Sequence, residues 1–160
     1  MTDQRAQLLR TLEETHQTLV SLPTSLDDSA LDFRPSTGEW SIREILAHLV
    51  DDEMYVMRTR VERVVKEDHP HLAPHDENKW YQTRNTTRDQ LSELLADFSL
   101  QRRASLGMLH PLRDSDWMRE GFQPEFGDLT AEGWLKRWVD HDTVHLRQIE
   151  TNLAAHLKPH

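Results

Sequence analysis

The sequence contains no cysteine among its 160 residues. This absence excludes disulfide bonds, thiolate metal ligands and a cysteine nucleophile, so any thiol used in a reaction must come from another molecule. Basic side chains are in deficit, because 19 Lys and Arg stand against 28 Asp and Glu and give a net charge of −9. A surface of that sign repels a phosphate backbone, so we expect no nucleic-acid partner.

Long hydrophobic runs are missing as well. No apolar segment approaches the roughly 20 residues that a membrane span needs, and residues 1–17 lack the apolar stretch of a signal peptide. We therefore expect a cytoplasmic protein with no membrane partner. The length suits one compact domain, residues 1–160, whose core needs no disulfides or metal to fold.

Apolar residues repeat with helical periodicity in four segments, approximately 3–21, 41–66, 87–109 and 131–156. The second segment has the clearest start, because Ser41 and Glu44 form the S-x-x-E pattern of a capping box. No segment shows strand-like alternation. The expected fold class is therefore all-α, a four-helix bundle, in which connections of about 20 residues fold over an end of the bundle or cross it.

Residues 141–145 read HDTVH and place two histidines four positions apart. On a helix this spacing projects both imidazoles from successive turns, so one metal ion can bind both. Alone, such a pair more often belongs to a hydrogen-bonded core or rim. The zinc-protease motif HExxH is a poor match, because Asp142 replaces the glutamate base. The same helical face carries Trp134, Trp138, Val144, Gln148 and Asn152.

His48, in the second helical segment, is the third candidate ligand. It lies at the edge of that helix's apolar arc, where its ring can point along a seam toward a neighbouring helix. A lone histidine there would be interpreted as a satisfied core or boundary residue. In combination, His48, His141 and His145 supply the three neutral nitrogen ligands of an open metal site built from two helices.

Several acidic and amide side chains close to these histidines have alternative interpretations. Glu53 either accepts a hydrogen bond from a ligating histidine or reaches solvent. Asp52, Asp142 and Gln148 are weaker candidates for the acceptor role. Asp51 and Asp52 fit better on a solvated charged face.

The connections between the helices offer further candidates. Trp80, expected on a loop, either packs over a pocket mouth or contacts a ligand. The three histidines of the proline-rich stretch DHPHLAPH, residues 68–75, are expected to be solvated. Loops 67–86 and 110–130 are expected to shape a substrate site.

Two longer stretches carry a family resemblance. Residues 40–49, WSIREILAHL, and residues 126–149, FGDLTAEGWLKRWVDHDTVHLRQI, resemble the DinB/YfiT-like superfamily of four-helix metalloproteins. DFRP at 32–35 and DENKW at 76–80 fit the same pattern in order and spacing. The resemblance spans nearly the whole chain, and its histidines are specific in combination.

The resemblance implies a four-helix bundle of up-down-down-up connection, with a divalent metal at one end. Position by position, the histidine of the family's second helix matches His48, and the later pair matches His141 and His145. Related proteins include S-transferases that use bacillithiol or mycothiol and a mycothiol-dependent isomerase. Many relatives look dimeric, so a homodimer is an expected assembly.

The function expected from this resemblance is metal-dependent transfer of a low-molecular-weight thiol, of the bacillithiol or mycothiol type, to a small electrophilic substrate. One divalent metal per chain is expected, zinc or nickel in purified protein, with iron, manganese or cobalt as alternatives. A second hypothesis keeps the same ligands and hydrolyses small esters or amides. A third is a non-catalytic metal-binding stress protein. The sequence assigns no catalytic residue.

Overall fold

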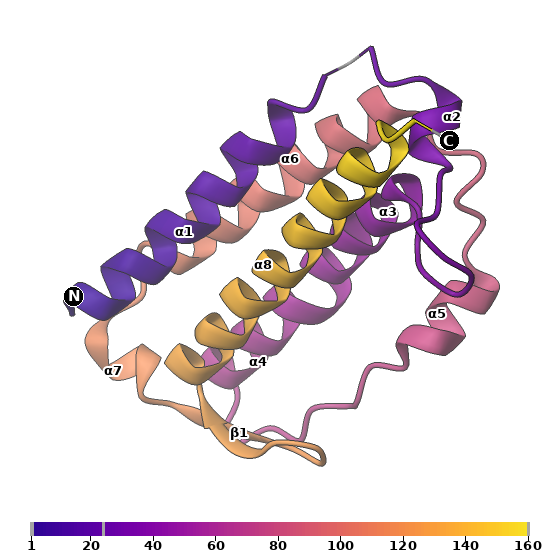
Figure 1. The fold of residues 1–160 in the computed structure, drawn as a ribbon. Helices are drawn as coiled ribbons and strands as arrows, with labels where there is room; N and C mark the ends of the chain where they lie inside the picture. Colours follow the sequence, from indigo (N-terminus) through magenta and orange to yellow (C-terminus); the bar gives the residue numbers. More distant parts are fainter. Residues whose placement is uncertain (1, 24, 160) are drawn as a thin grey trace.

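Four long helical segments run side by side in the computed structural model, which describes residues 2–23 and 25–159 (Figure 1). They are α1 (Asp3–Val20), α3 (Ile42–Asp52) continued by a π-helix (Glu53–Arg58) and α4 (Thr59–Lys66), α6 (Leu91–Leu109) and α8 (Ala131–His156). The connections hold α2 (Asp28–Leu31), α5 (Glu77–Thr83), α7 (Asp114–Trp117), β1 (Glu120–Gln123) and β2 (Gly127–Thr130). The predicted four-helix bundle is confirmed, and its four predicted segments agree with the structure to within four residues at each end.

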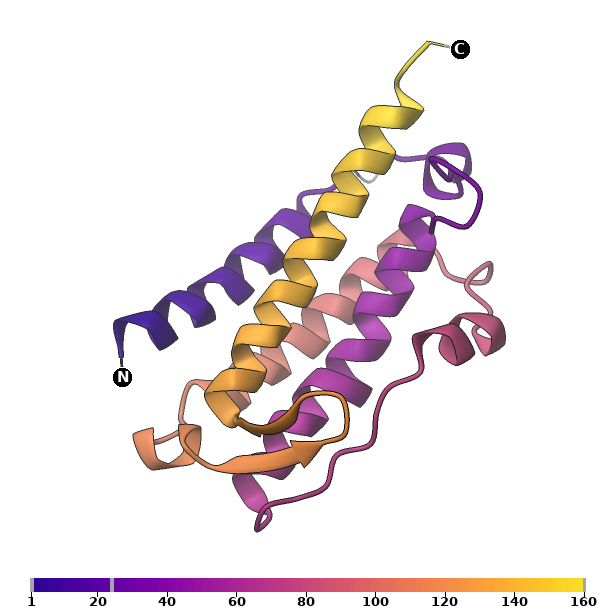
Figure 2. The ribbon, with the colours of Figure 1, turned by 60° about the horizontal axis from the view of Figure 1, so that its bottom comes forward.

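The bundle has the up-down-down-up connection. Helix α1 packs against α6 and α8, and α3 packs against the same two helices. Because α3–α4 and α6 point the same way, residues 67–90 must return along the length of the bundle before α6 begins (Figures 1 and 2). This is the crossing connection that the loop length predicts, and it carries α5. None of the described helices combines the length and apolar character that crossing a membrane requires.

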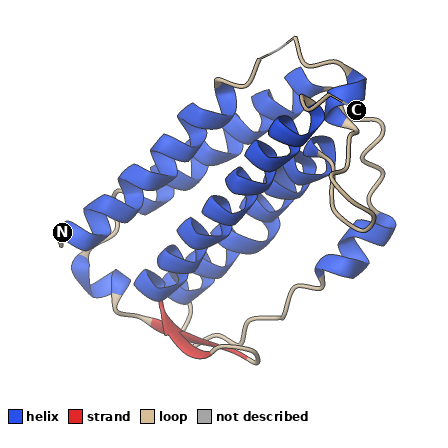
Figure 3. Cartoon of the chain, in the orientation of Figure 1, coloured by secondary structure: helices blue, strands red, loops and turns tan. Residues whose placement is uncertain are grey.

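A small β-hairpin closes the end of the bundle where α8 begins (Figure 3). Strand β1 pairs antiparallel with β2, with Glu120 opposite Thr130 and Gln123 opposite Gly127. The sequence did not predict this pair, because strands of four residues are too short to show alternation.

Side-chain caps fix where the helices begin. The Ser41 hydroxyl accepts a hydrogen bond from the amide of Glu44 at 3.2 Å, and the Glu44 carboxylate accepts one from the amide of Ser41 at 3.4 Å. The predicted capping box is therefore confirmed. At the start of α8, the Thr130 hydroxyl accepts from the amide of Gly133 at 3.0 Å. These caps satisfy amides that have no partner within the helix.

The apolar core is divided into two clusters, one in each half of the bundle. One includes Leu12, Leu109, Trp134 and Trp138; the other includes Leu19, Ile45, Phe98 and Ile149. Between them, each long helical segment contributes a buried polar side chain, and these are Thr15, Glu53, Arg102 and Asp142. The bundle is thus joined across its middle by polar contacts as well as by hydrophobic packing.

Arg102 of α6 is the centre of this polar layer. Its guanidinium donates to both carboxylate oxygens of Glu53, at 2.7 and 2.9 Å, and to Asp142 Oδ2 at 2.6 Å. Its remaining nitrogen donates to the backbone carbonyl of Leu12 at 2.8 Å. The indole of Trp138 adds a hydrogen bond to Glu53 at 3.0 Å. One fully buried cation therefore connects all four long helical segments.

Arg102→Leu is expected to lower the free energy of unfolding by about 3–5 kcal/mol, because the substitution leaves two buried carboxylates without their cation. Chemical denaturation monitored by circular dichroism measures the change. Arg103→Leu, at the exposed neighbouring position, is the matched control and is expected to shift stability by no more than about 0.5 kcal/mol. Equal, small effects of the two substitutions would contradict a central role for Arg102.

Candidate metal centre

The three predicted ligands meet where α3 packs against α8. The Nε2 atoms of His48 and His141 are 3.0 Å apart. The ring centroid of His145 lies 4.7 Å from that of His48 and 4.4 Å from that of His141. His48 and His145 are buried, and His141 is largely covered. The i, i+4 spacing on α8 and the antiparallel neighbour α3 thus produce the expected histidine cluster.

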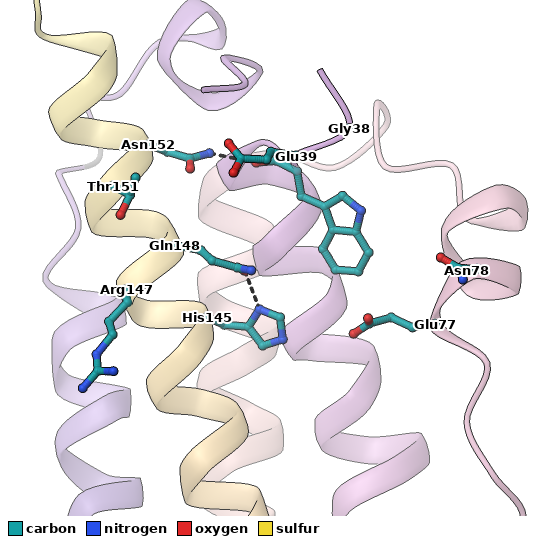
Figure 4. Close-up of a pocket in the computed structure, with 10 residues that line it drawn as sticks. Gly38, Glu39, Glu77, Asn78, His145, Arg147, Gln148, Thr151 and Asn152 are labelled. Atoms are coloured by element: carbon teal, nitrogen blue, oxygen red, sulfur yellow. Dashed lines mark hydrogen bonds between the residues drawn. The ribbon is translucent and has the colours of Figure 1, made fainter. Parts of the chain in front are cut away.

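Neighbouring side chains set how the α8 histidines are turned. Nδ1 of His145 lies 2.8 Å from Oε1 of Gln148, so a proton on Nδ1 is donated to that amide oxygen (Figure 4). This leaves Nε2 of His145 facing away from Gln148 with a free lone pair. Nε2 of His141 faces His48, while its Nδ1 lies 3.7 Å from Oδ1 of Asp142. Gln148 therefore contacts a predicted ligand as an acceptor, the role for which it was one of the weaker candidates.

Two carboxylates approach the same cluster. Asp52, one helical turn after His48, places Oδ2 at 3.3 Å from Nε2 of both His48 and His141. Asp52 is buried, so its predicted place on a solvated face is wrong. Glu77, at the start of α5, places Oε1 at 3.1 Å from Nε2 of His48. The site therefore contains acidic oxygens as well as imidazole nitrogens.

His75 also reaches the cluster, although the sequence predicted that it is solvated. Its Nε2 lies 3.2 Å from Oδ1 of Asp52, the carboxylate oxygen that faces away from the other histidines. His69, from the same stretch, is exposed and pairs with Asp128 at 2.7 Å. The sequence of residues 68–75 does not indicate which of these two histidines reaches the cluster. The path of the connection in three dimensions decides it.

Glu53 and Asp142 have structural roles that the sequence did not predict. Glu53 was expected to contact a ligating histidine or reach solvent, but its carboxylate is buried against Arg102 and Trp138. Asp142 shares the same arginine. The adjacent carboxylates Asp52 and Glu53 therefore have different partners, since Asp52 contacts the histidines and Glu53 contacts Arg102. They lie where α3 changes to a π-helix. Such π-helical turns are frequent near functional sites.

The site's electrostatics differ from one histidine to the next. Burial lowers the pKa of His48 to about 3. Burial, helped by the nearby His141, lowers the pKa of His145 to about 4. Both imidazoles are therefore neutral near pH 7 and have a lone pair to offer.

His141 shows the opposite behaviour. Burial acts to lower its pKa, but the nearby carboxylates of Asp142 and Asp52 outweigh burial and raise it to about 9. Burial alone would raise the pKa of Asp52, yet the nearby imidazoles of His141, His75 and His48 hold it below the ordinary value. Asp52 is therefore ionised, and its charge stabilises a positive charge within the cluster.

This donor set fits a divalent metal ion. Donor atoms of His48, Glu77, His141 and His145 all lie within 4.8 Å of one another, and those of His48, Asp52 and His75 form a second such group. Ligand atoms about 2.0–2.2 Å from one tetrahedral zinc ion are about 3.3–3.6 Å apart. The 3.0 Å approach of two imidazole nitrogens requires a proton or another cation between their lone pairs.

A polar pocket of about 440 Å³ opens beside the cluster (Figure 4). Its lining residues are Gly38, Glu39, Trp40, Glu77, Asn78, His145, Arg147, Gln148, Thr151 and Asn152. The predicted loop 67–86 contributes Glu77 and Asn78. The predicted loop 110–130 contributes none of the lining residues, because it lies around the hairpin at the other end of α8; the segment 38–40 takes its place.

Trp80 lies on helix α5 and not on a loop as predicted. Its ring meets the edge of the His48 ring at 5.1 Å and packs 5.5 Å from that of Trp40. The indole N–H donates to Asp51 at 2.7 Å. Of its two predicted roles, packing is the one that the structure shows.

A sequence model of the DinB superfamily matches residues 11–149. The chain belongs to the DinB superfamily. The chain is similar to YfiT of Bacillus subtilis, whose name proposes a metal-dependent hydrolase, with 26% identity over 150 residues that cover 92% of this chain and 83% of YfiT. YuaE of the same species, an uncharacterised protein, is 28% identical over 136 residues that cover 78% of this chain and 84% of YuaE.

The DinB superfamily fold is also seen in a solved structure. YfiT, described as a proposed metal-dependent hydrolase with an unusual four-helix bundle topology, matches the present structure with a TM-score of 0.85 at 25% sequence identity. The match covers 95% of this chain and 87% of the YfiT chain. The family and the fold that the sequence motifs predicted are therefore confirmed.

Gln148→Leu is expected to weaken divalent-metal binding about 10–100-fold, because His145 loses the acceptor that orients it. Competition with a chromophoric chelator measures the affinity. Thr151→Val, which alters another pocket residue one turn further along α8, is the control and should leave the affinity unchanged. Unchanged binding in Gln148→Leu would show that His145 needs no such support.

Proposed function

We propose that His48, His141 and His145 bind one divalent metal ion through their Nε2 atoms, and that the protein is a metal-dependent enzyme acting on a small polar molecule. The observation that carries this proposal is the convergence of the three imidazoles beside a 440 Å³ pocket. A pocket of this size is typical of small-molecule sites. Three protein nitrogens leave coordination positions open, as catalytic sites require.

The bound ion would supply Lewis acidity, which lowers the pKa of a coordinating water or thiol and polarises a substrate carbonyl. Nitrogen-rich ligation suits zinc, nickel, iron and cobalt, and the nearby carboxylates extend the range to manganese. The neutral state of His48 and His145 favours binding, because neither has a proton to lose near pH 7, whereas His141, whose pKa is about 9, would release a proton when the ion binds.

The chain's own residues would do the remaining work. Gln148 orients His145, and the carboxylate of Asp52 lies 3.2 Å from Nε2 of His75 and 3.3 Å from Nε2 of His141. Asp52 and the partly exposed His75 form an acid–base pair beside the site, positioned to hold or pass a proton at Oδ1 of Asp52. The polar wall formed by Asn78, Gln148, Thr151 and Asn152 would bind a hydrogen-bonding substrate.

Hydrolysis of a small ester or amide is the reaction we favour. The names of YfiT and several other relatives propose metal-dependent hydrolases. Asp52 places Oδ2 at 3.3 Å from Nε2 of both His48 and His141, where a hydrolytic water would need a proton acceptor.

Transfer of a low-molecular-weight thiol is the second candidate. The pocket is larger than a water nucleophile requires and has room for part of a polar thiol and its acceptor. The chain has no cysteine, so the thiol would be a second substrate. Lewis acidity at the same site would favour the thiolate, the form that attacks an electrophilic carbon.

Protein purified without nickel resin is expected to contain about one divalent ion per chain, and His48→Ala and His141→Ala are each expected to lose most of it. Elemental analysis by mass spectrometry measures the content. His110→Ala is the control, because His110 is an exposed histidine paired with Glu13 far from the cluster. Equal metal content in all four proteins would refute the three-histidine site.

Hydrolysis and thiol transfer are separated by an assay with the metal-loaded protein. The proposal predicts cleavage of small model esters or amides without added thiol, and loss of that cleavage in His141→Ala. Conjugation of bacillithiol or mycothiol to a model electrophile, with no thiol-free cleavage, would select the transferase instead. If neither activity is detected across a panel of both substrate types, the proposed catalysis is wrong and only metal binding stands.

A further inference from the structure

Helix α5 covers the cluster and is held there by side chains that are only partly buried. It consists of seven residues, Glu77–Thr83, and none of them is buried. Tyr81 stacks on Trp40 at 5.5 Å and accepts a hydrogen bond from Arg34, while Arg84 pairs with Asp51. Trp80 adds ring contacts with Trp40 and His48 and a hydrogen bond to Asp51. None of the α5 side chains in these contacts is fully buried, so α5 is held less firmly than the long helices whose apolar faces lie in the core.

Glu77 is the residue of α5 that reaches the cluster. Its side chain is 51% exposed, yet Oε1 lies 3.1 Å from the fully buried Nε2 of His48. Among the described residues, Glu77 is the carboxylate grouped with all three histidines, within 4.8 Å. Asp52 is grouped with His48 and His75 instead. A carboxylate in this position has the chemistry and spacing of a fourth metal ligand.

We propose that Glu77 is a fourth protein ligand of the divalent ion and that, through it, the ion fastens α5 over the pocket. The inference rests on the metal site proposed above. Glu77 and Asn78 line the pocket on the side opposite α8, as Figure 4 shows. Coordination by Glu77 would close that side, and its release would let α5 move and admit a substrate. Binding of the metal would thereby hold Glu77, and with it helix α5, against the pocket.

Hydrogen exchange tests this coupling directly in the full-length protein. The amides of Trp80 and Arg84 donate to the carbonyls of Asp76 and Trp80, at 3.0 and 2.9 Å, so their exchange reports opening of α5. Addition of zinc to the wild-type protein is expected to slow exchange in residues 79–84. In Glu77→Gln, zinc is expected to bind at least tenfold more weakly, with one ion per chain retained, and to give no protection of this segment.

Glu39→Gln is the matched control. Glu39 is an exposed carboxylate that lines the same pocket but is not part of either donor group. The same loss of charge there is expected to leave zinc affinity and the protection of α5 as in the wild type. Circular dichroism of the zinc-free proteins checks that both variants fold equally.

The outcomes separate the two proposals. Equal zinc affinity and equal protection of residues 79–84 in the wild type and Glu77→Gln would overturn the role of Glu77 while leaving the histidine site intact. An equal loss in Glu39→Gln would also overturn it, because general charge would then explain the effect. If wild-type protein and His141→Ala bind zinc alike, the histidine site itself is wrong, and the role of Glu77 is wrong with it.

Discussion

The buried guanidinium of Arg102 is the interaction on which the rest of the structure depends. It donates to carboxylates of the α3 segment and α8 and to a backbone carbonyl of α1, so one side chain of α6 sets the register of all four helical segments. A buried charge is tolerated only when its partners are held at hydrogen-bond distance. Hydrophobic packing above and below this layer stabilises the bundle but is non-directional. The arginine network therefore supplies the positional constraint.

That constraint extends directly to the histidine cluster. Glu53 follows Asp52, which faces the histidines, and Asp142 follows His141, a proposed ligand. Fixing Glu53 and Asp142 on one arginine therefore fixes the two helices that present the imidazoles. The remaining donors, His75 and Glu77, come from the connection that the parallel course of α4 and α6 makes necessary. The topology of the bundle therefore determines which side chains reach the site.

The sequence predicted the bundle, the Ser41 cap and the three histidines, because each depends on local spacing along one helix. It did not predict the positions of Asp52, Val144 or His75. Asp52 lies one regular helical turn after His48, but a wheel of one helix does not show that His75 and His141, from other parts of the chain, meet its carboxylate. The π-helical segment shifts the helical phase only for the residues after Asp52. Val144, placed by the wheel on the histidine face, is 52% exposed. His75 reaches Asp52 through the three-dimensional path of a proline-rich connection, which periodicity does not encode.

The central claim is that three Nε2 atoms from two helices bind one ion. It is tested most directly by crystallography of metal-loaded protein, with anomalous diffraction collected at the absorption edge of that metal. The account predicts one strong anomalous peak per chain, about 2.0–2.1 Å from Nε2 of each of His48, His141 and His145. A peak bound to other residues, or protein that remains free of metal at the cluster after loading, would contradict it.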